Sequence, residues 1–230
     1  MKAERKLSPR QVAKQQRILA AALKVFAEAG YSASSMDAIA LEAEVSKPTL
    51  YMYFGSKEQL FEAMMVAQRD VMLEPFEHPS GGMVQDLLDF AWHYADVVME
   101  PEFLSLARLI IGESQRFPEI GRAYQKAGPD RLLKGIIDYF EMQRGKGKLS
   151  FEDGELAAQD FWALILSAPR NLALHVPDQI PQRPHIRRYL ENGLKVFIKA
   201  YATDVTKNLG ELAGAIQKRE GGNSERETDR

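Results

Sequence analysis

The sequence predicts an all-α protein, and three observations support this fold class. Apolar residues recur at three- and four-residue intervals through most of the 230 residues, helix-start signals recur between these segments, and no alternating apolar–polar run is long enough to indicate a sheet. We expect an N-terminal helical domain over residues 1–55 and a larger helical domain over 56–217. Residues 218–230 are Gly-rich, polar and nearly free of apolar side chains, which predicts a disordered tail.

The first helix is predicted to begin after Ser8. Ser8 and Gln11 form a capping box, Pro9 occupies the first helical position, and Gly30 supplies the stop. Ser35 can cap a short second helix. The inner face of this second helix carries Ile39, Ala40 and Ala43.

A short third helix is predicted after a tight connection. Ser46 caps it, Pro48 lies in its first turn, where the missing N–H is harmless, and Gly55 ends it. Leu50 and Phe54 are four residues apart and therefore share an inward face. The residues left on its surface are Lys47, Thr49, Tyr51, Met52 and Tyr53.

Together the second and third helices predict a helix-turn-helix over residues 35–54. In that arrangement the start of the second helix of the motif enters the major groove of DNA, while hydroxyl groups and helix N-termini meet phosphates. Helix–turn–helix geometry also occurs as pure structure, so this alternative stays open on the residues alone.

The remaining chain is predicted to be helical as well. A capping box at Ser56–Gln59 opens a fourth helix that runs through about Leu73. Amphipathic patterns predict the later helices, which span residues 83–99, 102–115, 118–144, 152–174 and 184–203.

Composition excludes several classes of protein. The chain has no Cys, so disulfides and thiolate metal sites are excluded. The four His residues show no paired ligand spacing, and no catalytic motif is present, so we expect no metal, no cofactor and no enzymatic activity. The N-terminus lacks the apolar segment of a signal peptide, and the longest apolar run, 161–169, is too short to cross a membrane. We expect a cytoplasmic protein with no membrane partner.

The net charge of −2 conceals a basic N-terminus. Residues 1–24 contain seven Lys or Arg residues against Glu4 alone. A basic segment on an otherwise acidic protein indicates a polyanion contacted at one end of the chain. A solvated leader without a partner is the alternative.

The last two predicted helices suggest an interface. The final one carries an apolar stripe at helical spacing, and the one before it is apolar nearly all round, which requires cover on both sides. A second subunit is the simplest cover, and burial in the core of a monomer is the alternative. The predicted interface residues are Phe161, Ile165, Ile186, Leu190, Leu194, Phe197 and Tyr201.

The middle helices supply candidates for a ligand pocket. Such pockets combine an apolar wall with a few polar groups. The candidates are Met65, Trp92, His93, Phe103, Arg108, Glu113, Phe117, Tyr124 and Trp162. Each aromatic residue among them, taken singly, is more often ordinary core than pocket lining. Because the wall is aromatic, we expect a small, largely apolar or aromatic ligand.

Residues 17–64 resemble the N-terminal domain of the tetracycline-repressor (TetR) family. The resemblance is carried by AEAGY at the end of the first helix, AIA in the second, and VSKPTLYMYFGSKEQLF across the third and fourth. Residues 108–131 are similar to a C-terminal domain type found in one branch of that family. The resemblance implies a homodimeric, all-helical DNA-binding regulator with a C-terminal domain that binds a small ligand and dimerises.

The resemblance also implies roles for individual residues. Base edges are expected near Lys47, Pro48 and Thr49, phosphates near Tyr51, Tyr53 and Lys57, and small hydroxyl contacts from Ser34, Ser35 and Ser46. This chain departs from the family at Glu44, where the turn usually carries Gly. If that position is left-handed, a non-Gly residue there costs about 1 kcal/mol.

The sequence therefore predicts a homodimeric repressor that binds a palindromic operator in double-stranded DNA and is released by a small-molecule effector. An activator or a ligand-independent regulator is an open alternative. Two other classes also remain: a helical enzyme that retains a helix-turn-helix as structure, and an architectural DNA protein without a preferred palindrome.

Overall fold

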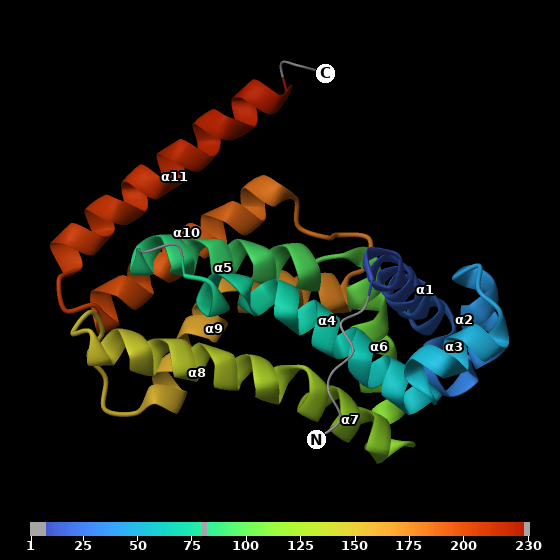
Figure 1. The fold of residues 1–230 in the computed structure, drawn as a ribbon. Helices are drawn as coiled ribbons and strands as arrows, with labels where there is room; N and C mark the ends of the chain where they lie inside the picture. Colours follow the sequence, from blue (N-terminus) through green and yellow to red (C-terminus); the bar gives the residue numbers. More distant parts are fainter. Residues whose placement is uncertain (1–7, 80–81, 228–230) are drawn as a thin grey trace. The chain divides into compact units, whose positions relative to one another are not determined.

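The protein is described here by a computed structural model of residues 8–79 and 82–227, with side chains as far as Arg219. Helices make up the described chain and no strand is found in it, which confirms the predicted fold class (Figure 1). The helices are α1 (Pro9–Ala33), α2 (Met36–Glu42), α3 (Lys47–Phe54), α4 (Lys57–Glu77), α5 (Met83–Val98), α6 (Pro101–Ser114), α7 (Pro118–Ala127), α8 (Pro129–Gly145), α9 (Gly154–His175), α10 (Arg183–Tyr201) and α11 (Val205–Glu227).

The described chain forms two compact units, and α4 passes from one to the other. The first unit contains residues up to Arg69 together with 100–129, and the second contains 70–99 and the chain from Asp130 onward. In the first unit α6 packs along α1, where the Ser105 hydroxyl donates a 3.0 Å hydrogen bond to the Ala27 carbonyl. The helix-turn-helix is therefore packed together with α6 and α7.

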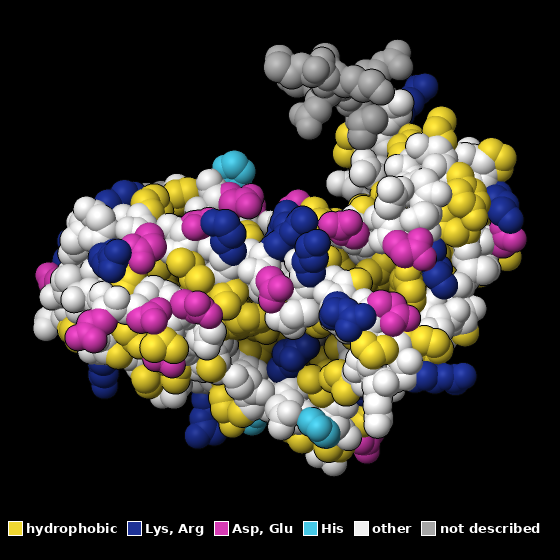
Figure 2. All heavy atoms as spheres, turned by 90° about the horizontal axis from the view of Figure 1, so that it is seen from below, with side chains coloured by type: hydrophobic (Ala, Val, Ile, Leu, Met, Phe, Trp, Pro, Cys, Tyr) yellow, Lys and Arg dark blue, Asp and Glu magenta, His cyan; other side chains and the backbone are white. Residues whose placement is uncertain are grey.

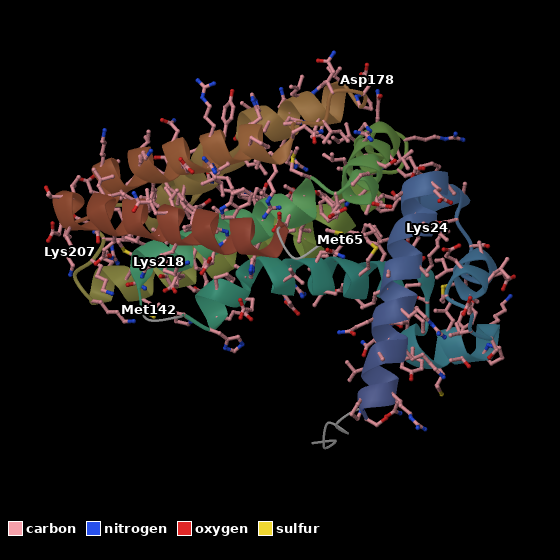
Figure 3. All side chains as sticks on the ribbon, turned by 90° about the horizontal axis from the view of Figure 1, so that it is seen from above. Lys24, Met65, Met142, Asp178, Lys207 and Lys218 are labelled. Carbon is pink, nitrogen blue, oxygen red and sulfur yellow. The ribbon has the colours of Figure 1, made fainter. Side chains whose placement is uncertain are left out.

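Local signals place α1 and α2 as predicted. Ser8 forms the capping box with Gln11, and Gly30 (φ 80°) interrupts the regular helix before the chain turns through Ala33. The Ser35 hydroxyl oxygen accepts a 3.1 Å hydrogen bond from the Ala38 N–H and caps α2. Lys24 of α1, labelled in Figure 3, forms a 2.8 Å ion pair with Glu42 of α2. The Lys24–Glu42 ion pair fixes α2, the first helix of the helix-turn-helix, on α1.

Two predicted segments differ from the structure. The helix expected over 118–144 is divided into α7 and α8 at Gly128, because Pro129 has no N–H to continue the helix and disfavours helical geometry at the residue before it. The tail expected from residue 218 is helical as far as Glu227, and 228–230 lie outside the described residues.

The core of the second unit is aromatic. Rings from α4, α5, α8, α9 and α10 meet there, with Phe76 and Tyr139 stacked at a centroid distance of 4.0 Å and Phe140 and Phe197 at 5.0 Å. The Tyr139 hydroxyl donates a 2.7 Å hydrogen bond to buried Asp86, and burial raises the pKa of Tyr139 well above its usual value. Satisfying this buried carboxylate removes a penalty of about 1–3 kcal/mol.

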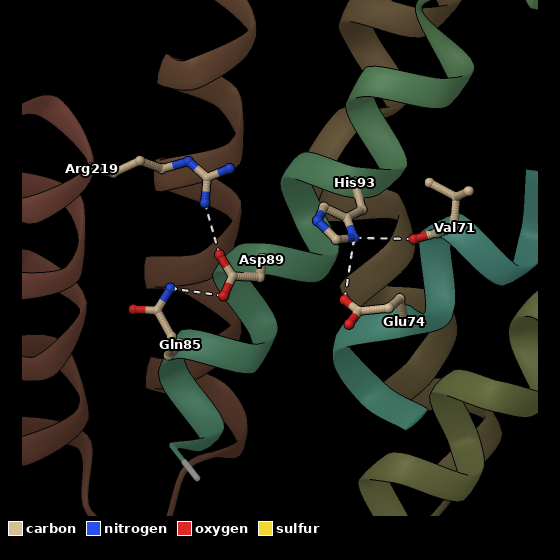
Figure 4. A network of polar contacts seen from close by, with 6 residues as sticks. All are labelled: Val71, Glu74, Gln85, Asp89, His93 and Arg219. Atoms are coloured by element: carbon tan, nitrogen blue, oxygen red, sulfur yellow. Dashed lines mark hydrogen bonds and ion pairs between the residues drawn. The ribbon is translucent and has the colours of Figure 1, made fainter. Parts of the chain in front are cut away.

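A polar network attaches α11 to this unit. Arg219 forms a 2.7 Å ion pair with Asp89 of α5 (Figure 4). Its guanidinium also lies 5.4 Å from the centroid of the Trp92 ring. Arg183 of α10 lies on the same ring at 4.4 Å. These contacts give Arg219 of α11 partners that the polar, Gly-containing sequence around it does not reveal.

Candidate DNA-binding and ligand sites

The orientation of α3 is set by its two buried residues. Leu50 and Phe54 have exposed fractions of 0% and 6%, which confirms the predicted inward face. At the N-terminus, the Ser46 hydroxyl lies 2.8 Å from the Thr49 hydroxyl and accepts a hydrogen bond from the Thr49 N–H. At the other end Gly55 adopts φ 69°, a conformation that Gly adopts at low cost. The helix is thus held by its inner face and both ends.

The outer face of α3 is open to solvent. Tyr51 is 42% exposed and Met52 is 74% exposed, while Lys47 and Pro48 at the start of the helix are also exposed. Thr49 and Tyr53 are half-buried. Side chains of this kind on the exposed N-terminal half of a recognition helix can reach base edges and phosphates in a major groove.

Lys47 forms an ion pair with an acidic residue of its own chain. Its ammonium lies 2.8 Å from the carboxylate of Asp37 at the start of α2. The hydrogen bond from Lys47 to Asp37 raises the pKa of Lys47, so the lysine remains charged at neutral pH. Any contact from Lys47 to DNA must therefore compete with an acidic neighbour that the sequence pattern did not reveal.

The turn of the motif contains a left-handed residue. Glu44 adopts φ 51°, and among the described residues other than Gly it alone has a positive φ. The position where the chain departs from the family is therefore left-handed, and a non-Gly residue there carries a steric cost. Two backbone bonds close the turn, from the Glu44 N–H to Leu41 and from the Val45 N–H to Ala40, and the guanidinium of Arg17 donates to the Glu44 carbonyl at 3.4 Å.

The three predicted serine contacts have different environments. Ser35 and Ser46 are exposed at the N-termini of α2 and α3, where their hydroxyls cap the helices. Ser34 is 6% exposed, and its hydroxyl donates a 2.8 Å hydrogen bond to the Tyr31 carbonyl. A phosphate contact from the Ser34 hydroxyl does not fit this burial.

Lys57 has a structural role that sequence reasoning missed. Its ammonium donates hydrogen bonds to the carbonyls of Tyr31 at 2.8 Å and Ser34 at 3.1 Å, and it lies 4.5 Å from the centroid of the Tyr31 ring. It therefore binds the start of α4 to the end of α1. The phosphate contact predicted for Lys57 stays a prediction, and it would have to be made by an ammonium that already has partners.

The predicted ligand-pocket residues are divided between the two units. Trp92, His93 and Trp162 belong to the second unit, whereas the other six belong to the first. Met65, Trp92 and Phe103 have exposed fractions of 2%, 5% and 3%, so they are packed as core. The others in the first unit are Arg108, Glu113, Phe117 and Tyr124.

Several of the polar candidates are used in internal contacts. Glu113 accepts hydrogen bonds from the N–H and the hydroxyl of Ser32, at the end of α1. Nδ1 of His93 lies 3.0 Å from the Val71 carbonyl and 3.9 Å from Glu74 (Figure 4). Both residues therefore stabilise helix packing within their own units.

Each unit has a cleft of its own. In the first, a cleft of 330 Å³ lies between the start of α4 and α7, and none of the predicted pocket residues lines it. In the second, a more open groove of 420 Å³ runs along α9 and includes Trp162, Arg170 and Tyr94. Trp162 is therefore a predicted pocket residue that lines a groove, the one along α9.

The predicted interface stripe is inside the chain. Phe161, Ile165, Leu190, Leu194 and Phe197 are fully buried, and Ile186 is 8% exposed. Side chains that are already covered by their own chain cannot form the contact surface of a second subunit. For these six residues the alternative, burial in the core, is correct; Tyr201 is half-buried, with its hydroxyl 2.5 Å from Asp160.

The reason is the close packing of α9 on α10 (Figure 1). At Gly193, a Cβ atom would collide with the carbonyl oxygen of Leu164, so the two helices approach backbone to backbone. The apolar stripe of α10 is buried in this contact and in the aromatic core. The faces of α9 and α10 that are exposed to solvent are not the faces that carry these six predicted interface residues.

The described residues contain neither a metal-binding cluster nor a membrane-spanning helix. No group of three His, Asp or Glu side chains there is arranged to hold a metal ion. None of the described helices is both long enough and apolar enough to span a bilayer. On the face drawn in Figure 2, Lys and Arg side chains are interspersed with Asp and Glu.

Comparison with known proteins identifies the family. Residues 18–64 match the model of bacterial regulatory proteins of the tetR family, and residues 85–203 match the C-terminal domain of AefR-like transcriptional repressors. The chain belongs to the TetR family. Its matched relatives are transcriptional regulators, which are not enzymes.

TetR-family structures resemble the protein over most of its length. A regulator from Mesorhizobium loti is 28% identical with a TM-score of 0.69, and the match covers 85% of this chain and 100% of that one. The flavonoid-responsive regulator FrrA is 34% identical with a TM-score of 0.61, over 84% of this chain and 98% of that one. Among curated proteins, the regulator YvkB of Bacillus subtilis is 26% identical over 82% of this chain and 97% of its own. The protein is therefore a TetR-family DNA-binding transcriptional regulator.

Proposed function

We propose that this regulator is a homodimeric repressor that binds a palindromic operator through α3 and releases it when a small, largely apolar or aromatic ligand binds. The observation that carries the DNA half is the exposed face of α3, with Lys47, Pro48 and Tyr51 outward and Leu50 and Phe54 holding the helix in place. A regulator of this kind works in the cytoplasm. The proposal assigns DNA binding to residues 1–55 and ligand binding and dimerisation to residues 56–217.

Repression and ligand release are supported by the relatives. The matched C-terminal model is named for a repressor, and FrrA is named for its response to a flavonoid, an aromatic compound. A ligand acts on DNA binding only through its different affinities for the two conformations of the protein. By linkage, operator DNA must weaken ligand binding by the same factor.

The dimer surface we propose is the outer face of α9. Residues 161–169 contain no charged side chain, yet Ala163, Ser167 and Ala168 are exposed, and Leu172 one turn later is 39% exposed. An uncharged face on a surface helix is typical of contact with another chain. Two copies related by a two-fold axis present two recognition helices and therefore require an inverted repeat in the DNA.

Selection of bound DNA from a random pool tests this function. We expect an inverted repeat with half-sites about one helical turn apart, or a multiple of it. Tyr51→Phe, which removes only the hydroxyl, should weaken binding to the selected site, whereas Leu41→Ala, on the 82% exposed side chain of α2, should leave it unchanged. Enrichment of no sequence would contradict operator recognition and favour an architectural protein.

A reporter gene placed behind the selected site decides the direction of regulation. Higher expression in cells that lack the protein would support repression. Lower expression would show that it is an activator, and an unchanged response to every compound that binds the protein would show a ligand-independent regulator.

A further inference from the structure

The cleft of the first unit has walls from three helices. Its volume is 330 Å³, at the lower end of the range of about 300–1,000 Å³ that is typical of small-molecule sites. Tyr31 at the end of α1 closes one side. The other lining residues are Glu58, Gln59, Phe61 and Glu62 from α4, and Glu119, Ile120, Ala123, Lys126 and Ala127 from α7.

The chemistry of the lining combines an apolar body with negative charge. Phe61 of α4 and Ile120 of α7 are buried side chains of the lining, and Ala123 lies one turn after Ile120 on α7. The lining holds three carboxylates and one ammonium, Lys126, which leaves a net charge of −2. A cavity with low-dielectric walls and one sign of charge concentrates ligands of the opposite charge.

Hydrogen bonds keep part of this charge fixed. A bond to its own backbone N–H and another to Ser56 hold the pKa of Glu58 below its usual value, so this carboxylate is ionised at neutral pH. Burial, followed by the proximity of Glu58, raises the pKa of Tyr31 to about 12. The phenol is therefore neutral and donates its hydrogen bond to Glu58.

We propose that this cleft binds a small organic cation, an amine with an apolar aryl or alkyl body. The body would lie between Phe61 and Ile120, and the ammonium would lie toward the carboxylates of Glu119 and Glu62. A neutral molecule of the same shape would gain the apolar contact without the charge, and an organic anion would be repelled.

The cleft is mechanically linked to the recognition helix. Gln59, one of its lining residues, packs directly on Gly55 at the end of α3, because a Cβ atom at Gly55 would collide with Oε1 of Gln59. The carbonyl of Tyr31, another lining residue, accepts a 2.8 Å hydrogen bond from the ammonium of Lys57. On the α7 side of the cleft, Gly128 directly follows the helix, and a Cβ atom there would lie 2.9 Å from Cε of Met65 on α4.

A molecule wedged between α4 and α7 would therefore displace side chains that hold the end of α3. We expect the bound cation to lower the affinity for operator DNA. This regulatory step rests on the proposed function, whereas binding of the cation to the free protein does not. The two can be measured separately.

The binding test uses three probes that share a phenyl–alkyl body: 4-phenylbutylamine, 4-phenylbutyramide and 4-phenylbutyrate. Isothermal titration of the full chain without DNA should show the amine binding more tightly than the amide and the carboxylate binding least. Glu119→Gln should weaken the amine by about fivefold and leave the amide unchanged, because the lost interaction is one exposed charge pair. Glu152→Gln, the same change on an exposed residue of the second unit, is the matched control.

Location is tested by filling the cleft. Ala123→Phe places a ring in the cleft and should abolish binding of both the amine and the amide. Because Ala123 is exposed, the unfolding midpoint of this variant should equal that of the parent chain. Binding of the amine to Ala123→Phe with unchanged affinity would overturn the site. Equal affinity for the three probes, or no binding of the amine at millimolar concentration, would overturn the ligand class.

The coupling test adds DNA. Saturating 4-phenylbutylamine should lower affinity for the selected operator by about tenfold, and saturating operator should lower affinity for the amine by the same factor. If the amine binds the free protein and DNA affinity does not change, the coupling is wrong and the site stands. If no DNA sequence is selected in the absence of the amine, the proposed function is wrong, whatever the result of the binding test.

Discussion

The ammonium of Lys57 lies 2.8 Å from the backbone carbonyl of Tyr31, and this contact joins the start of α4 to the end of α1. A second carbonyl, that of Ser34, accepts from the same ammonium at 3.1 Å. The chain between these two carbonyls leads directly into α2. Lys57 thus holds the segment that leads into the helix-turn-helix, in addition to any contact with a phosphate.

Lys57→Ala should lower the free energy of unfolding by about 1–2 kcal/mol, because two half-buried carbonyls lose a charged donor. Urea denaturation measures the loss. Lys57→Arg should keep most of the stability, and Lys199→Ala, on the exposed face of α10, is the control for removal of a surface lysine. If Lys57→Ala loses operator affinity with an unchanged unfolding midpoint, phosphate contact and not support of α1 is the role of Lys57.

Asp37→Asn should increase affinity for DNA of any sequence. The change frees Lys47 from its 2.8 Å partner and removes a negative charge beside the recognition helix. The increase should be larger at low salt, because exposed charges are screened at high ionic strength. Lys47→Ala should instead relax base preference at one position of each half-site by about tenfold. A uniform loss across all sequences after Lys47→Ala would assign Lys47 to phosphate.

Glu44→Gly should raise the free energy of unfolding by up to about 1 kcal/mol, because Gly adopts a left-handed conformation without the steric cost of a Cβ atom. Glu44→Asn should be close to the parent chain, and Glu44→Val should be the least stable of the set. Thermal unfolding of the four proteins gives the order. A Glu44→Val protein as stable as the Glu44→Gly protein would show that the turn does not hold φ 51° in solution.

Leu172→Glu should convert the dimer into a folded monomer, because it places a charge on the proposed outer face of α9. Sedimentation gives the mass, and circular dichroism shows whether the helices persist. Ile111→Glu is the matched control, since Ile111 is 63% exposed and lies on α6. A dimer that survives Leu172→Glu would exclude this face as the interface.

Phe197→Ala addresses the buried stripe of α10. Phe197 is fully buried against Phe140, Phe161 and Tyr201, so its truncation should cost about 3–5 kcal/mol of stability. The protein that remains folded should still be dimeric at high concentration. Loss of the dimer without loss of stability would restore the stripe as an interface.

Arg219→Ala should lower the free energy of unfolding of the second unit by about 1 kcal/mol. It removes a partly exposed ion pair with Asp89 and a cation–π contact with Trp92. Lys218→Ala, one residue earlier on the exposed side of α11, should have no effect (Figure 3). Equal stability of the two variants would show that the end of α11 is not held by Arg219.

The sequence alone determined the helix-turn-helix because every signal that defines it is local. Ser46 caps a helix whose N–H partner is three residues away, Gly55 ends it in a left-handed conformation, and Leu50 and Phe54 share a face through their spacing. The family resemblance identified Glu44 as a departure within the turn, and the structure shows that this residue is left-handed. Each of these relations spans fewer than five residues.

The tertiary structure decided the features that depend on which helices meet. Periodicity shows that α10 has an apolar stripe, but it cannot tell the chain's own core from a second subunit. The close approach of α9 at Gly193 is what turns that stripe inward. Lys57 reaches a carbonyl 26 residues earlier, and the cleft of the first unit is lined by residues of both α4 and α7. Such contacts are set by how side chains of distant helices interlock at their crossings, and that geometry is not contained in the pattern of any one helix.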